Sequence, residues 1–213
     1  MQIAQREIYL GDQKFILTNQ RALFWPEYKA LVISDLHIGK TAHFRKNGIA
    51  VPASVLHKDL DRLRTLCQFF QVQEIIVAGD LVHASENSDV TYFEQWLKQL
   101  QGVDLILVEG NHDRISRKRW AEMGVPQVFS ELTRGSVTIV HQFQPGHNFF
   151  QINGHVHPGV VLQSKTGRLR LPCFLHNKEN LLLPAFSAFT GLDTTSIPIG
   201  EVYCFDEDSI FTI

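Results

Sequence analysis

Hydrophobic and polar residues follow two different patterns along this chain, and the pattern changes near Pro126. In the first half, short apolar runs are typical of strands covered on both faces of a sheet, at residues 30–34, 74–78 and 104–108. Helices are expected between and after these runs, at residues 52–71, 89–101 and 114–123. Strands that alternate with helices in this way predict a parallel arrangement with right-handed crossovers.

Strand-like patterns dominate the remainder of the chain. Residues 2–24 alternate between polar and apolar side chains around a Gly11-Asp12 turn, which predicts a hairpin and a third short strand. The polar and basic residues 40–52 predict a loop. After Pro126 the pattern predicts strands almost exclusively, at residues 136–141, 148–153, 159–164, 168–175, 179–183, 199–205 and 209–213. We therefore expect a single domain over residues 1–213, in which two sheets pack together with helices outside.

Composition narrows the class of protein without indicating a substrate. The 213 residues are 44% hydrophobic and 20% charged with a formal net charge of −2, which excludes disorder and predicts that any polyanion site is a local basic patch. Three widely spaced cysteines, Cys67, Cys173 and Cys204, favour a reducing compartment. Neither a signal-peptide pattern nor a membrane-length apolar run is present, so we expect a soluble cytoplasmic protein without membrane contact. No oligomeric state is indicated.

Polar side chains that can bind metals follow the predicted strands where each strand ends. They are Asp35, His37, Asp80, Asn111, His141, His155 and His157. Because the carboxyl ends of parallel strands meet at one edge of a sheet, Asp35, Asp80 and Asn111 are expected to cluster. Asp-x-His or Gly-Asp alone is more often a turn, and a histidine more often donates to a carbonyl. The prediction therefore depends on the joint occurrence of the set, in order, at strand ends.

The chemistry of this ligand set predicts two metal ions. Carboxylate, imidazole and carboxamide groups without thiolates suit Mn²⁺ first, with Fe, Zn²⁺ and Co²⁺ as alternatives. Seven ligands exceed the needs of one ion but fit two ions that share a carboxylate. Such a pair, about 3.5–4 Å apart, holds phosphoryl oxygens and lowers the pKa of a bridging water, so that hydroxide forms near neutral pH. We therefore expect hydrolysis of phosphoesters by attack of a metal-bridging hydroxide.

The ordered motifs D-x-H, G-D, G-N-H-D, H and G-H-x-H between residues 35 and 157 resemble those of the calcineurin-like metallophosphoesterases. The resemblance implies a four-layer αββα sandwich of two mixed β-sheets flanked by helices. It also implies metal-site roles: Asp35, His37 and His157 on one ion, Asn111, His141 and His155 on the other, and Asp80 as the bridge. His112 matches the histidine that contacts the substrate phosphate and protonates the leaving oxygen, and Asp113 matches the acid that holds that imidazole.

A narrower resemblance covers most of the chain. Segments 35–52, 79–83, 154–159 and 171–174, and segment 183–186 with 189–191, are similar to the ligase-associated DNA-damage-response phosphoesterases. That group is assigned as DNA endonucleases and is grouped with a DNA ligase and a helicase, so the resemblance implies a DNA-repair role with those functional partners. One departure is His141-Gln142-Phe143, where an acidic residue and a proline are expected after the histidine. The difference affects charge beside the ligand and bears on fine substrate preference.

Further residues near the motifs are candidates for substrate contact. His43, Arg45 and His83 are candidates beside the metals, with a solvated basic loop as the alternative for the first two. The basic run 114–119 could follow a nucleic-acid backbone or form a solvated helix face.

Three functions stay open at this point. A phosphodiesterase or nuclease acting on DNA or RNA is favoured by the basic segments 40–46 and 114–119. A phosphomonoesterase or nucleotide phosphohydrolase would use the same metal motifs. A non-catalytic scaffold of this fold ranks last, because scaffold relatives lose ligands and the catalytic histidine that are all present here.

Overall fold

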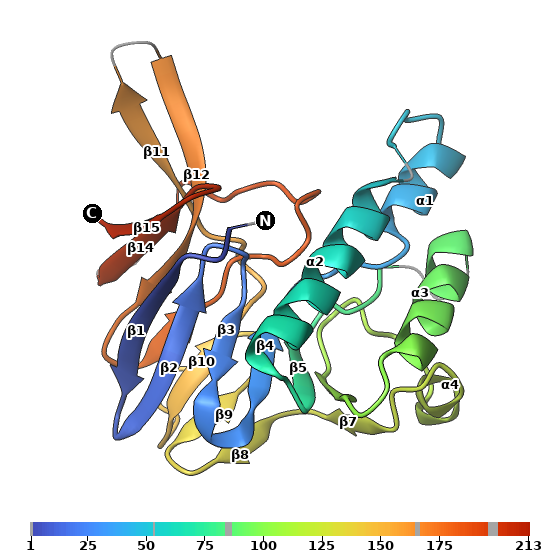
Figure 1. Cartoon of the computed structure of the whole chain (residues 1–213), viewed down its shortest axis with the longest axis horizontal. Coiled ribbons are helices and arrows are strands. Elements are labelled where there is room, and N and C mark those ends of the chain that lie inside the picture. The colour runs from blue at the N-terminus through green and yellow to red at the C-terminus, as the bar shows by residue number, and fades with distance from the viewer. Residues whose placement is uncertain (1, 53, 84–86, 165–166, 196–199) are drawn as a thin grey trace.

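Two mixed β-sheets pack against each other in the computed structural model, which describes residues 2–52, 54–83, 87–164, 167–195 and 200–213 (Figure 1). The first sheet has the strand order β1 (Gln5–Leu10), β2 (Gln13–Thr18), β3 (Leu23–Trp25), β4 (Ala30–Ile33), β5 (Glu74–Ala78), β6 (Asp104–Val108) and β7 (Gln127–Phe129). Neighbours from β1 to β4 are antiparallel and those from β4 to β7 are parallel. A short 3-10 turn, η1 (Pro26–Tyr28), connects β3 to β4.

The second sheet is built almost wholly from the second half of the chain. Its order is β15 (Ile210–Thr212), β14 (Glu201–Phe205), β12 (Gly167–His176), β13 (Asn180–Leu182), β10 (Phe150–Asn153), β9 (Val137–Ile139) and β8 (Leu132–Arg134). A further strand, β11 (Gly159–Ser164), lies off this path and pairs with β12. Within this order, β9–β10 and β10–β13 are the parallel pairs.

Alternation along the central strands explains why their sequences are apolar throughout. In β4, Leu31 and Ile33 face a core shared with the helices, whereas Val32 faces the core between the sheets. Both cores are therefore filled from the same strand. The helices are α1 (Lys40–Lys46), α2 (Ser54–Phe70), α3 (Ser88–Gln99) and α4 (Arg117–Glu122). None of the described helices is long and apolar enough to cross a membrane.

The observed architecture confirms the predicted sandwich of two mixed sheets with flanking helices. The described helices all precede Met123, and the last three contribute side chains to the core on the first sheet. The other face of the second sheet carries a smaller apolar cluster that includes Val160, Cys173 and Val202 and, in the described part of the chain, contains no helical residue. The absence of helical periodicity after Pro126 is the reason for this asymmetry.

Three local features differ from the sequence expectation. Residues Lys40–Lys46 form α1 rather than a loop. The strands β7 and β8, of three residues each, were not expected, because such short edge strands carry too little periodicity to be recognised. The helix expected over 114–123 is restricted to Arg117–Glu122, since Ser116 caps it by accepting from the Arg119 backbone N–H.

Candidate metal centre

Backbone hydrogen bonds join the loops that leave β4 and β5. The Asp35 N–H donates to the Gly79 carbonyl at 3.0 Å, and the His37 N–H donates to the Asp80 carbonyl at 2.9 Å. The ends of the neighbouring parallel strands therefore hold these two ligand loops side by side, as the strand pattern predicted.

The backbone at the candidate ligands is unusual. Positive φ angles occur at Asp35 (54°), His37 (50°), Asp80 (53°), His155 (77°) and His157 (54°). Non-glycine residues adopt this left-handed conformation at a cost of about 1 kcal/mol or more each, and they keep it where the surrounding structure requires it. The concentration of this strain on five candidate ligands is typical of a functional site.

Three glycines of the motifs are needed because ligand side chains lie against them. A Cβ atom would overlap a ligand side chain in each case: Gly79 with His141, Gly110 with Asp80, and Gly154 with Asp35. The glycine in each motif therefore leaves room for a ligand that belongs to a different loop.

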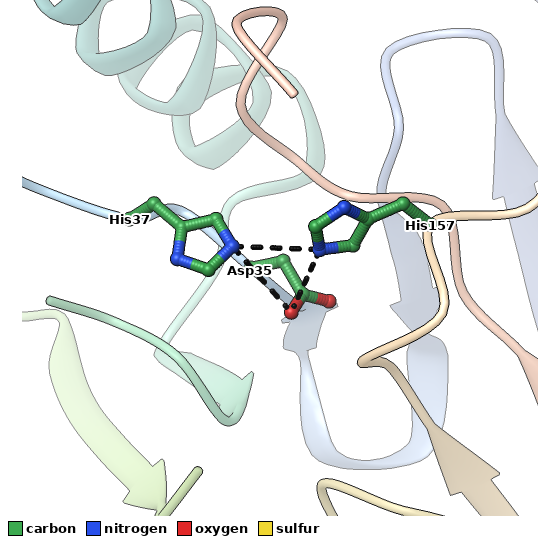
Figure 2. A group of neighbouring side chains, drawn as sticks. All are labelled: Asp35, His37 and His157. Carbon is green, nitrogen blue, oxygen red and sulfur yellow. Dashed lines mark hydrogen bonds and ion pairs between the residues drawn. The ribbon is translucent and has the colours of Figure 1, made fainter. Parts of the chain in front are cut away.

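The first group of ligands consists of Asp35, His37 and His157 (Figure 2). Asp35 Oδ1 lies 3.2 Å from His157 Nε2 and 3.9 Å from His37 Nε2, and the two imidazole Nε2 atoms are 3.4 Å apart. Burial lowers the pKa of His37 to about 3, so its imidazole is neutral near pH 7 and retains a lone pair for a cation.

The carboxylate of Asp35 is held within the protein core. It is fully buried, and its Oδ2 accepts a hydrogen bond from the His155 backbone N–H at 3.0 Å. Burial alone would raise the pKa of Asp35, but hydrogen bonding and charge from His157 outweigh it and keep the pKa below its ordinary value. Among the described residues its Oδ1 has no hydrogen-bond donor apart from the facing imidazoles, which fits a site for a cation.

The second group consists of Asp80, His141 and His155, with Asn111 beside them. His141 Nε2 lies 3.5 Å from Asp80 Oδ2, 2.9 Å from Asn111 Oδ1 and 3.1 Å from His155 Nδ1. The Nδ1–H of His141 donates to the Ala78 carbonyl at 3.1 Å, which leaves Nε2 as an acceptor. With this tautomer, His141 Nε2 and the Asn111 oxygen are two acceptors turned toward each other, an arrangement that suits two ligands of one cation.

These residues fit two divalent ions. Within each group of three, the ligand atoms all lie within 4.8 Å of one another, and the donors are oxygens and imidazole nitrogens without thiolates. The structure therefore presents two candidate metal sites and brings all seven sequence-predicted ligands to them.

His112 lies at the open side of the second group. Its side chain is 41% exposed, and its Nε2 is 4.0 Å from Asp80 Oδ2. Its backbone N–H donates to Asp80 Oδ1 at 2.9 Å. The His83 ring stacks on the His112 ring with 5.0 Å between centroids, and burial, followed by the charge of His112, lowers the pKa of His83.

Asp113 differs from its expected role beside His112. Its carboxylate accepts backbone N–H bonds from Val82 at 3.1 Å and from Gly110 at 2.8 Å. No hydrogen bond between Asp113 and the His112 ring occurs among the described residues. Burial raises the pKa of Asp113 to about 7. Asp113 therefore ties together the loops that carry Asp80 and Asn111, and the stacked His83 takes the position beside the His112 ring.

A cleft of about 550 Å³ borders His112 and is lined by His43, Val82, His83, Asn111, Arg114 and Ile115. The predicted substrate contacts His43 and His83 thus lie at the cleft, with their rings 5.6 Å apart. A slightly larger cavity of about 600 Å³ is lined by residues that include Arg21, Arg62 and Asp206. It contains none of the ligands, which leaves the cleft beside His112 as the candidate substrate site.

Arg45, the third predicted substrate contact, has a structural partner instead. Its Nη2 donates to Asp89 Oδ1 at 3.0 Å, while Asp89 Oδ2 accepts from the Thr41 hydroxyl and from the Ala42 N–H. Asp89 is 6% exposed. The guanidinium therefore fastens α1 to α3 rather than facing the cleft.

We expect the Asp89→Ala variant of the metal-free protein to lose about 2–4 kcal/mol of unfolding free energy, because three donors of α1 lose a buried acceptor. Urea unfolding measures this change, with Asp61→Ala, an exposed position on α2, as the matched control expected within about 0.5 kcal/mol of wild type. An Arg45→Ala variant with wild-type stability but weaker substrate binding would contradict the anchoring role.

Two of the four cations in the basic run 114–119, Arg117 and Arg119, have carboxylate partners. Arg117 lies 2.8 Å from Glu109, and Arg119 lies 2.5 Å from Glu94. The Nε of Arg114 donates to the Asn111 carbonyl at 3.3 Å. The helix α4 therefore does not present a row of free cations.

Lys40 is a site residue that sequence reasoning did not single out. It begins α1, and its backbone N–H donates to the His37 carbonyl at 3.0 Å. Burial lowers the pKa of its ammonium, and the Asp35 and Asp80 carboxylates act in the opposite direction. Its position three residues after His37 was the available signal. The ammonium therefore lies within electrostatic range of both carboxylates.

Comparison with known proteins agrees with this geometry. The family model of the calcineurin-like phosphoesterases matches residues 28–180. The chain belongs to this family. Comparison with curated proteins finds no match.

Among solved structures, the chain is similar to the Pseudomonas putida nuclease MPE, with a TM-score of 0.84 and 29% identity over 98% of this chain and 100% of that one. A protein of unknown function from Aquifex aeolicus, AQ665, aligns with a TM-score of 0.43 and 18% identity over 60% of this chain and 78% of that one. The Escherichia coli phosphoesterase Yfce aligns with a TM-score of 0.40 and 16% identity over 84% and 88%, respectively.

Proposed function

We propose that this calcineurin-like phosphoesterase hydrolyses phosphodiester bonds of nucleic acid, with DNA as the favoured substrate. The observation that carries the proposal is the pair of facing ligand groups, one built on Asp35 and one on Asp80, beside a cleft where His112 is exposed. The similarity to a solved nuclease supports the same substrate class. A role in DNA repair, with a DNA ligase and a helicase as functional partners in the cytoplasm, extends this proposal on the motif resemblance.

The seven ligands would hold two divalent ions, with Mn²⁺ favoured. We assign Asp35, His37 and His157 to one ion and Asn111, His141 and His155 to the other, with Asp80 shared. Ions bound there would supply positive charge to the phosphoryl oxygens and lower the pKa of a water molecule.

The remaining chemistry belongs to side chains around the cleft. His112 is placed to donate a proton to the leaving oxygen, and the His83 ring supports the orientation of the His112 ring. Lys40 adds a positive charge beside the carboxylates. His43 lines the outer part of the cleft, where a substrate longer than one phosphate group would extend.

The substrate class is tested by three substrates with Mn²⁺-loaded protein: bis(p-nitrophenyl) phosphate, p-nitrophenyl phosphate and circular single-stranded DNA. We expect kcat/KM for the diester to exceed that for the monoester by at least about tenfold, and linear products from the circle. A preference for the monoester, with the circle intact, would favour a phosphomonoesterase or nucleotide phosphohydrolase instead. Elemental analysis that finds no bound metal would contradict the two-ion assignment.

A further inference from the structure

A β-hairpin extends from the second sheet directly after the last metal-ligand motif. It consists of β11 and residues 167–172 of β12, and we call it the basic hairpin. Residues 173–176 of β12 pair with β13 and β14, so in the described part of the chain the basic hairpin has no neighbouring strand in the sheet. In Figure 1 it projects beyond the body of the molecule. Six residues at about 3.3 Å each give it a length of about 20 Å.

The pairing register separates the hairpin into two faces. Val160 pairs with Leu171 and Leu162 pairs with Leu169, which makes one face apolar. That face is buried near the body, where Val160 is 2% exposed, and open near the tip, where Leu169 is 51% exposed.

The opposite face is basic. Arg170 pairs with Val161 and Arg168 pairs with Gln163, so neither arginine faces a carboxylate across the strands. Both arginines are exposed, and within the described ranges neither forms an ion pair. The two arginines are two residues apart on one strand, so their Cα atoms are about 7 Å apart along the hairpin.

The arginines of the hairpin, which are unpaired among the described residues, contrast with three of the arginines that lie closer to the ligands in sequence. Arg45, Arg117 and Arg119 each have a carboxylate within 3.0 Å, as described above. A protein with a net charge of −2 attracts a polyanion only through a local group of uncompensated cations. The basic hairpin provides such a group, and the chain reaches it from the ligand His157 through Pro158 alone.

We propose that the basic hairpin binds the sugar–phosphate backbone of a single nucleic-acid strand outside the catalytic cleft. This inference depends on the proposed nuclease function and adds a second point of contact to it. Arginine guanidinium groups form paired hydrogen bonds to phosphate oxygens, and exposed Val161 on the same face offers apolar contact to sugars or bases. The exposed apolar residues Val161 and Leu169 lie on opposite faces, so they do not form one patch for a second copy of this chain.

The test compares the R168A/R170A variant with wild type on a single-stranded oligonucleotide and on bis(p-nitrophenyl) phosphate, both with Mn²⁺. We expect the ratio of kcat/KM for the oligonucleotide to kcat/KM for the small diester to fall by about tenfold. The slope of log affinity against log salt should become shallower by about 1.4, since each lost phosphate contact accounts for about 0.7 on a single strand.

Two matched variants make the result specific. R168K/R170K keeps both charges and should retain most of the wild-type salt slope. R6A/K178A removes two exposed charges from β1 and from the turn at the other end of β12, and it should leave the wild-type ratio unchanged.

The possible failures are distinguishable. If wild type cleaves the oligonucleotide and R168A/R170A keeps its salt slope and its substrate ratio, the hairpin proposal alone is wrong. If wild type hydrolyses bis(p-nitrophenyl) phosphate but neither binds nor cleaves the oligonucleotide, the nuclease function is wrong and the hairpin proposal falls with it. If light scattering shows that R168A/R170A changes the oligomeric state, the hairpin serves contact between copies of the chain, which also overturns the proposal.

Discussion

The Asp35→Asn variant is expected to lose at least about a thousandfold in kcat/KM for bis(p-nitrophenyl) phosphate and to bind less metal than wild type. Asp35 is fully buried and faces the Nε2 atoms of His37 and His157, so its charge is the main compensation for a cation at that point. A metal ion that stabilises a phosphoryl transition state contributes several kcal/mol, and each 1.36 kcal/mol corresponds to about tenfold in rate.

Asparagine is the informative replacement. Asp35 has a φ of 54°, a conformation that asparagine tolerates and alanine does not. The amide oxygen can still accept the N–H of His155, so the loop keeps its shape while the charge is lost. Rates are measured together with elemental analysis of the dialysed protein, and thermal unfolding of the metal-free form checks that the variant is folded.

Asp61→Asn is the matched control, because that carboxylate is 69% exposed on α2, a helix that contributes no ligand. It should keep wild-type rate and metal content. Full metal content and full activity in Asp35→Asn would remove Asp35 from the metal centre and with it the assignment of the first ligand group.

The gathering of the ligands follows from physics that is readable in the sequence. Apolar runs such as 74–78 require cover on both faces, which indicates parallel strands, and the ends of parallel strands meet at one edge. Gly-Asp and Gly-Asn-His-Asp follow such runs directly, so the strand ends fix Asp80 and Asn111 at the carboxyl edge of the sheet. The glycines that leave room for His141 and Asp80 could be recognised in the sequence as motif residues. The sequence did not show which ligand side chain packs against each glycine.

Other features depend on contacts that no local pattern contains. The helix α1 has no strong apolar stripe, and its acceptor Asp89 lies more than forty positions away in sequence, so residues 40–46 looked like a loop. Asp113 is adjacent to His112, which suggested a contact between them, but both of its oxygens accept backbone N–H groups of ligand loops instead.

The ion pairs of the arginines are the clearest example of contacts that the sequence does not reveal. Arg117 and Arg168 are equally basic in sequence, and only the fold shows that the first has Glu109 at 2.8 Å while the second lies on an open hairpin face. A run of basic residues therefore predicts nucleic-acid contact poorly until its ion pairs are known. For this reason the contact that we propose lies on the basic hairpin rather than on α4.

The His112→Ala variant should retain metal but lose about 10²–10⁴-fold in turnover of DNA, the range attributed to general acid catalysis. Metal is retained because the support that His112 gives to Asp80 comes from the backbone N–H, which alanine preserves. The loss should be much smaller on bis(p-nitrophenyl) phosphate, because p-nitrophenolate is a stable anion that departs without a proton. The dependence on the leaving group separates proton donation from a loss of positioning, which would reduce both rates equally.

Single-turnover rates on both substrates, with elemental analysis, provide the measurement. His147→Ala, a partly exposed histidine paired with Glu131 at 3.9 Å rather than placed at the cleft, should match wild type on both substrates. Equal losses on both substrates, or a parallel loss of metal, would assign His112 to the metal centre or to substrate positioning and leave the proton donor to be found among His43 and His83.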